Sequence, residues 1–146
     1  MNCKHIIALA VLWQILVTVA QAQTTSWKGT SSTSWGTAAN WTAGVPTASL
    51  DAIVGDTNFT GANQPAISAI SVCRSLTLGT GATISTVTIS RKLTVSGNVT
   101  IGSNGKISHT ASKTSYPIIL TGNWTNSGAY VGSSANSSVT FRETLI

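Results

Sequence analysis

Residues 86–102 read TVTISRKLTVSGNVTIG and contain nearly the same phrase three times. Each copy is a triplet in which a threonine lies between two apolar residues. The triplets begin six residues apart, at Val87, Leu93 and Val99. Alternate side chains of a β-strand point to opposite sides. Each triplet therefore sends its two apolar side chains to one side and its threonine to the other.

Stacked in register, the triplets form one apolar core with threonines outside. The predicted core set is Val87, Ile89, Leu93, Val95, Val99 and Ile101, and the predicted outer set is Thr88, Thr94 and Thr100. Two architectures satisfy this pattern: an antiparallel meander or sandwich, and a β-solenoid in which each triplet is one side of a coil.

Turn chemistry favours the solenoid. Two-residue hairpins prefer Asn-Gly, Asp-Gly or a leading Gly, and the Ser90-Arg91 connection has none of these. The spacing of the other short β phrases is irregular, which suits a right-handed parallel β-helix with coils of roughly twenty residues. We therefore predict an all-β, right-handed parallel β-helix, with the antiparallel meander or sandwich as the alternative.

The composition agrees with strands. Charged residues make up 8% of the chain, against about 25% in an average soluble protein. Ser, Thr, Gly and Asn are frequent, and residues 23–146 contain no stretch with sustained helical spacing of apolar residues. The length allows one domain with a modest core.

Residues 1–22 have the pattern of a secretory signal peptide. Lys4 precedes an apolar run that ends at Ala20, and Ala20-Gln21-Ala22 is an A-x-A cleavage site. The run is shorter than the ~20 residues that a membrane span needs, and no later segment is long and apolar enough. We expect a secreted or cell-surface protein that keeps no membrane span after cleavage.

Residues 23–146 divide into two parts of different composition. Residues 23–67 are rich in tryptophan and turns, and we predict that they form an N-terminal aromatic cap. Residues 68–146 are short β phrases separated by Gly and Asn, and we predict that they form the coils of a solenoid that is incomplete at its C-terminal end.

Motifs in the cap segment resemble a known kind of surface protein. Trp27 with Gly29, Ser34-Trp35, Ala39-Asn40-Trp41 and Gly44 with Pro46 form a W-x-G, S-W, A-x-N-W, G-x-P series before short L-T-L and V-T-V phrases. This series resembles the N-terminal region of large secreted β-helical, adhesin-like proteins of Bacteroidetes, similar in style to autotransporter-associated β-strand repeats. The resemblance implies a bacterial cell-surface location. The tail VTFRETLI departs from the V-T-F-x-G of that pattern, which favours a fragment.

Four tryptophans are the candidate binding residues. In one interpretation they form a platform on which sugar rings stack; in the other they cover the end of the solenoid, where core and strand edges meet water. The cap is favoured because most of them lie in residues 23–67, and Trp124 is expected at a coil corner, with Asn123 and Asn126 bonding turn backbone. The set is Trp27, Trp35, Trp41 and Trp124.

The ionisable residues offer little for catalysis. After Gln23 the acids are Asp51, Asp56 and Glu143, and His109 is the only histidine. Asp51 and Asp56 form a conceivable glycosidase pair, although Gly55-Asp56 is more typical of a turn. We predict no catalytic residues, no metal and no cofactor, and we expect Cys73, the only cysteine after residue 22, to be buried.

The net charge of +5 does not indicate a nucleic-acid partner, because the basic residues are dispersed. We expect a non-catalytic structural or adhesive module whose partners include extracellular glycans. The alternatives are a carbohydrate-binding module that uses exposed tryptophans and, third, a remnant of a polysaccharide-degrading β-helix enzyme. The uncovered C-terminal end, including Phe141, Leu145 and Ile146, predicts end-to-end self-association or docking of further downstream domains.

Cleavage after Ala22 is directly testable. We expect N-terminal sequencing of exported material to begin at Gln23, because the A-x-A signature places the signal-peptidase site there. Exported protein that still starts at Met1 would contradict the signal-peptide interpretation.

Overall fold

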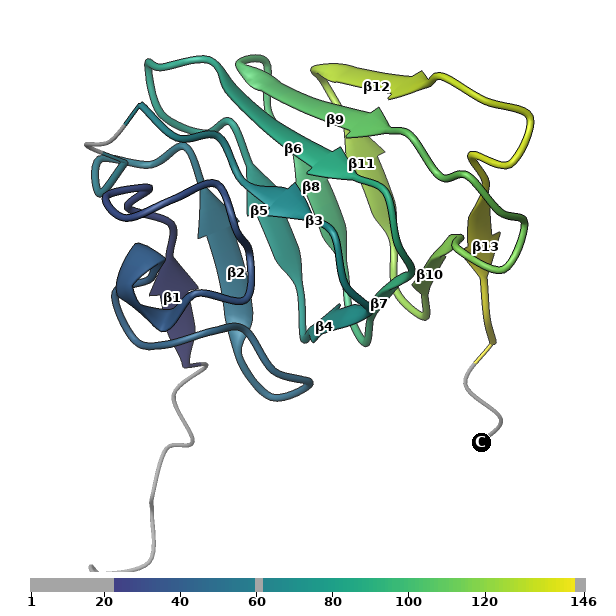
Figure 1. Ribbon diagram of the computed structural model, residues 1–146, viewed down its shortest axis with the longest axis horizontal. Coiled ribbons are helices and arrows are strands. Elements are labelled where there is room, and N and C mark those ends of the chain that lie inside the picture. Colours follow the sequence, from purple (N-terminus) through teal and green to yellow (C-terminus); the bar gives the residue numbers. More distant parts are fainter. Residues whose placement is uncertain (1–22, 60–61, 144–146) are drawn as a thin grey trace, which may run out of the picture.

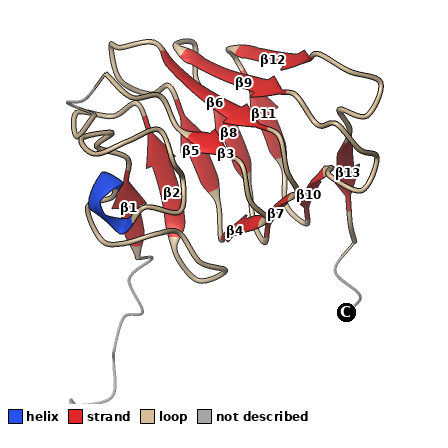
Figure 2. Cartoon of the chain, viewed as in Figure 1, coloured by secondary structure: helices blue, strands red, loops and turns tan. Residues whose placement is uncertain are grey.

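The chain folds as a β-solenoid of about five turns built from parallel sheets (Figure 1). This computed structural model describes residues 23–59 and 62–143, so the predicted signal peptide lies outside the described residues. The only described helical element is a short 3₁₀ turn, Ala38–Asn40, and the rest is strand and loop (Figure 2). The all-β prediction is confirmed.

Three sheets form the sides of the solenoid; the first coil contributes a strand, β1, to the first sheet alone, and each later described coil contributes one short strand to each sheet. The first sheet contains, in spatial order, β1 (Thr24–Ser26), β2 (Asp51–Val54), β5 (Leu76–Leu78), β8 (Val99–Ile101) and β11 (Trp124–Asn126). The second contains β3 (Ala66–Ile67), β6 (Ser85–Ile89), β9 (Gly105–His109) and β12 (Ala129–Gly132). The third contains β4 (Ser71–Cys73), β7 (Leu93–Val95), β10 (Ile118–Leu120) and β13 (Val139–Phe141).

All strand pairs among the described residues are parallel. The antiparallel meander or sandwich, our alternative, is therefore wrong. Hairpins would have joined successive triplets as neighbours in one sheet, whereas here each triplet pairs with a strand one coil away.

The three quoted triplets are the three sides of a single coil, because β6, β7 and β8 lie in different sheets. Their six apolar residues have no solvent exposure, as predicted. Paired positions recur every 20 to 25 residues from β2 onward, as in Leu76 with Val99 and Val99 with Trp124. The coil length is thus close to the expected twenty.

The core consists of columns of inward-facing side chains that cross the coils. In the first sheet, Ala52, Leu76 and Val99 share one column, and all three are fully buried. The residue between the apolar pair of each strand faces outward, so Thr77, Thr100 and Thr125 form an outer row. The alternation seen in the sequence is what separates core from surface.

Residues 23–67 are not a separate unit. Their strands β1 and β2 belong to the first sheet and β3 belongs to the second, so the Trp-rich segment and the later coils share one stack. β1 and β13 lie at opposite ends of that stack (Figure 1).

A glycine is needed where the chain turns from the first sheet to the second. Gly79 has a φ of +69°, a conformation that L side chains rarely adopt, and a Cβ at this position would collide with the backbone of Gly105 in the next coil. Close stacking at this corner leaves no room for a side chain.

We expect Gly79→Ala to lower the free energy of unfolding by about 2–3 kcal/mol or more, since strain at a positive φ is joined by a backbone clash. Gly36→Ala is the matched control, because a Cβ there meets nothing within 4 Å and its φ is not positive. Chemical denaturation of both variants measures the difference. Equal stability of the two would show that the corner is not tightly stacked.

Candidate functional site

Three tryptophans of the N-terminal segment form a buried aromatic cluster. Trp27, Trp35 and Trp41 are 0%, 2% and 2% exposed. Trp41 makes edge-to-face contacts with both others, at ring-centroid distances of 5.1 Å and 4.7 Å. The Trp41 indole N–H donates to the carbonyl of Trp35 (2.8 Å), and the Trp27 indole N–H donates to the carbonyl of Asn63 (2.9 Å).

This cluster has no ring face open to a sugar, so Trp27, Trp35 and Trp41 are not a stacking platform. That part of the candidate set needs correction, because the rings join the core of the first coil. The aromatic cap is what the structure contains. Its position covers the N-terminal end of the apolar columns.

Asn40 holds the loop around the cap, a role that our sequence reasoning missed. Its buried side chain accepts hydrogen bonds from the backbone N–H groups of Ser31 and Ser32 and donates to the carbonyl of Ser34. A buried amide with these partners fixes the path of the chain between Trp35 and Trp41. The A-x-N-W motif was the available signal.

The C-terminal end carries a second, more open aromatic group. We call it the C-terminal end layer; it is the inward-facing side of β11, β12 and β13, with the residues Trp124, Asn126, Tyr130, Val139 and Phe141. These residues line a hollow of about 390 Å³. Phe141 is 62% exposed, which confirms its predicted exposure at this end; Leu145 and Ile146 lie outside the described residues.

We had expected Trp124 at a coil corner, but it lies within β11. It pairs in register with the buried Val99, so its ring faces the core column and packs edge-to-face on Tyr130 at 5.6 Å. Because no described strand covers β11, the ring remains half-buried. Trp124 is the one candidate tryptophan with a surface that a ligand can reach.

The asparagine predictions are confirmed in part. Asn126 accepts a hydrogen bond from the backbone N–H of Gly128, as a turn residue should. At the corner between the third and first sheets, the side chain that bonds turn backbone is that of Asn98. It accepts a hydrogen bond from the backbone N–H of Asn123, one coil further on (2.9 Å). The Gly-Asn pairs at 97–98 and 122–123 stack directly, and their repetition in the sequence was the overlooked signal.

A buried histidine lies directly beneath the end layer. His109 occupies a core column in register with Ile89 and has no solvent exposure. Its Nδ1 shares a hydrogen bond with the hydroxyl of Tyr130 (2.9 Å), and its Nε2 lies 3.1 Å from the carbonyl oxygen of Tyr116. Burial lowers the pKa of His109, and the contact with Tyr116 opposes that shift in part.

Asp51 and Asp56 have structural partners. Asp51 pairs with Arg74 through two hydrogen bonds, and the hydrogen bond from Arg74 lowers the pKa of the Asp51 carboxyl. Asp56 accepts from Ser26 (2.7 Å) and from the backbone of Asn58, as expected of a turn residue. A glycosidase acid needs a raised pKa, so Asp51 does not fit that role.

Other candidate chemistry is also accounted for. Cys73 is buried as predicted, and desolvation raises the pKa of its thiol to about 12, so it is a packing residue rather than a nucleophile. Within residues 23–59 and 62–143, no three His, Cys, Asp or Glu side chains gather in a group able to hold a metal ion. The described part of the chain has no helix long and apolar enough to cross a membrane.

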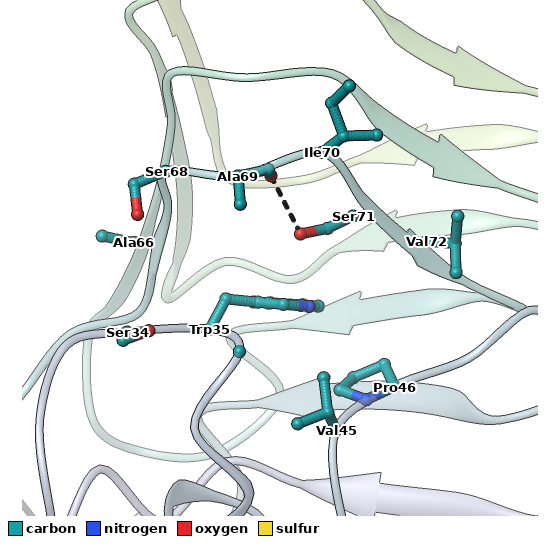
Figure 3. Close-up of a pocket in the computed structure, with 11 residues that line it drawn as sticks. Ser34, Trp35, Val45, Pro46, Ala66, Ser68, Ala69, Ile70, Ser71 and Val72 are labelled. Carbon is teal, nitrogen blue, oxygen red and sulfur yellow. Dashed lines mark hydrogen bonds between the residues drawn. The ribbon is translucent and has the colours of Figure 1, made fainter.

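A second hollow, of about 260 Å³, lies between the N-terminal segment and β4 (Figure 3). Its walls come from both sides: Trp35, Val45 and Pro46 from the cap segment, and residues 68–72 from the connection into β4. The lining has no charged residue. Sequence reasoning missed this hollow, because it depends on the path of a loop that has no periodic pattern.

No protein-family model, no curated protein and no solved structure matches this chain. The likeness to Bacteroidetes adhesin-like proteins therefore stays a prediction from sequence motifs.

His109 should make stability depend on pH. Its pKa is lowered in the folded state, so the unfolded chain takes up the proton first, near pH 6.5. Stability is therefore complete above that pH and falls as the pH decreases below it. We expect the melting temperature of residues 23–146 to fall between pH 7 and pH 5. The fall should be smaller in His109→Gln, since these residues have no other histidine. Equal slopes for both proteins would contradict this assignment.

Proposed function

We propose that this chain is a non-catalytic structural and adhesive module of an exported bacterial cell-surface protein. The observation that carries the proposal is the difference between the two ends of the solenoid. The N-terminal end is covered by a buried tryptophan cluster, and the C-terminal end presents the aromatic end layer to solvent.

The stack supports a structural role. Parallel backbone ladders run through all three sheets, and each coil packs only on its neighbours. Such a body is stiff along its axis and holds a surface at a fixed distance from its base. A spacer of this kind needs no cleft and no reacting groups.

The ionisable groups support the absence of catalysis in this proposal. Asp51 is held in an ion pair, Asp56 in a turn, and His109 between Tyr130 and Tyr116 in the core. Each of these groups already has a structural partner. None of these three groups is therefore left as the unpaired acid or base that the enzyme-remnant interpretation needs.

The end layer supports the adhesive role. Its exposed apolar side chains lie beside the edges of β11, β12 and β13 that no described strand covers, and an uncovered edge of a sheet is a template for pairing with another chain. Docking of another coil or another molecule on this surface removes both the apolar side chains and the strand edges from water. Self-association or the docking of a further domain is the interaction that this end favours.

Carbohydrate binding remains the second candidate, and the half-buried Trp124 ring favours it. Trp124, Tyr130 and Phe141 line one open hollow, and an accessible aromatic face is the usual stacking surface for a sugar ring. The hollow is the place where a glycan would bind, instead of the N-terminal cluster.

Light scattering after size-exclusion chromatography tests the proposal. We expect residues 23–146 to associate with rising concentration and Phe141→Glu to stay monomeric, because a charge in the end layer opposes its burial. Val131→Glu is the matched control: Val131 is 44% exposed, but it faces outward from β12. A wild-type protein that remains monomeric at high micromolar concentration contradicts the adhesive role of this end. Saturable quenching of tryptophan fluorescence by a glycan, lost in Trp124→Ala, would favour the carbohydrate-binding module.

A further inference from the structure

The third sheet ends at β4, although the chain winds one coil further toward its N-terminus. That first coil contributes β1 to the first sheet and a single bridge, Ser34 with Ala66, to the second. It contributes no strand to the third sheet: among the described residues, β4 pairs with β7 on one side and with no strand on the other. β4 therefore has a free edge beside the hollow shown in Figure 3.

The hydrogen-bond pattern shows which backbone groups face that edge. The N–H of Ser71 donates to Lys92, and the carbonyl of Cys73 accepts from Ser96, so residues 71 and 73 bond to the β7 side. In a parallel ladder, alternate residues bond to opposite neighbours. The N–H and C=O of Val72 therefore point to the free edge, and neither has a backbone partner among the described residues.

The side chains at this edge are apolar. Ile70 is 63% exposed and Val72 is 39% exposed. Natural edge strands are usually protected by charges, by proline or by a covering loop. β4 itself contains neither a charge nor a proline, and the loop with Val45 and Pro46 lies across the hollow and makes no backbone hydrogen bond to β4 among the described residues. An exposed apolar edge with unpaired backbone groups is suited to a partner that supplies another strand.

The hollow beside the edge limits what this partner is. Its volume of about 260 Å³ is below the ~300–1,000 Å³ of small-molecule sites, so it suits one or two side chains rather than a whole ligand. Its uncharged, mainly apolar lining favours an apolar side chain. An extended segment in which apolar residues alternate with other residues can place one apolar side chain in this hollow.

Trp35 supplies a second, independent indication. Its indole N–H is buried and has no hydrogen-bond partner among the described residues, whereas Trp27 and Trp41 both donate to carbonyl oxygens. In Figure 3 the nitrogen lies at the end of the ring that points between Ser71 and Pro46. A buried donor without a partner is destabilising. An added strand would bring carbonyl oxygens to the side of the hollow on which this donor lies.

We propose that the free edge of β4 binds an extended, uncharged peptide segment of a partner protein. The segment adds a strand to the third sheet, bonds the N–H and C=O of Val72, and places one apolar side chain in the hollow above Trp35. This is recognition by strand addition, in which backbone bonds give affinity and a side-chain pocket gives selectivity.

The test uses a fluorescein-labelled peptide without charged side chains, Gly-Ser-Leu-Thr-Val-Ser-Gly, whose central triplet has the sequence of residues 93–95, the strand on the other side of β4. Fluorescence anisotropy with the purified chain should show saturable binding. Val72→Pro removes the edge donor but leaves the bonds of residues 71 and 73 to β7, so it should weaken binding by about tenfold. Val72→Thr keeps the donor and should bind within about twofold of the wild type.

The peptide gives a control that does not alter the protein. A version N-methylated at Leu, Thr and Val cannot donate from its central triplet and should not bind, which keeps the test decisive if Val72→Pro misfolds. Equal binding of both peptides, or no saturable binding of the unmodified one, overturns the proposal. If the chain alone self-associates through a contact that Val72→Pro removes and the peptide competes with, the occupant is a second copy and the partner-peptide assignment is wrong.

Discussion

Backbone hydrogen bonds between successive coils are the interaction on which this structure depends. Most of its strands are only three residues long, so a single strand buries too little to be stable without the strands above and below it. Within residues 23–59 and 62–143, every inner coil has two such neighbours, and each end coil has one. The unusual features of the molecule accordingly gather at its ends: the tryptophan cluster at one, the aromatic end layer at the other, and the free edge of β4 beside the first coil.

Two buried polar residues show how the ends are held in place. Asn40 satisfies backbone groups of the loop that carries the cap, and His109 joins the last core column to Tyr130 in the end layer. At either position an apolar residue would leave backbone or hydroxyl groups without partners. They fix the paths of segments that the short strands alone would leave free to shift.

The repeating part of the fold could be predicted from sequence, because strand periodicity is a local property. Alternation in the triplets identified the inward and outward residues, and poor turn chemistry at Ser90-Arg91 favoured a solenoid over hairpins. The position of Trp124 could not be predicted in this way, since it depends on register with Val99 one coil away. The hollow beside β4 was also beyond reach, because it arises from the path of residues 27–50, which have no period. The sequence alone also did not decide whether Trp27, Trp35 and Trp41 form a buried cap or an exposed platform for sugar rings.

The corners of the solenoid differ in how much length they tolerate. The turn from the third sheet to the first always takes two or three residues, and at 97–98 and 122–123 it is a stacked Gly-Asn pair. The turn from the second sheet to the third takes three residues after β3 and β6, but eight after β9 and six after β12. This edge accommodates extra residues without disturbing the register of the coils on either side. A foreign loop inserted between His109 and Ile118 would therefore project from a rigid stack, which makes this corner the natural place to display an added segment on the solenoid.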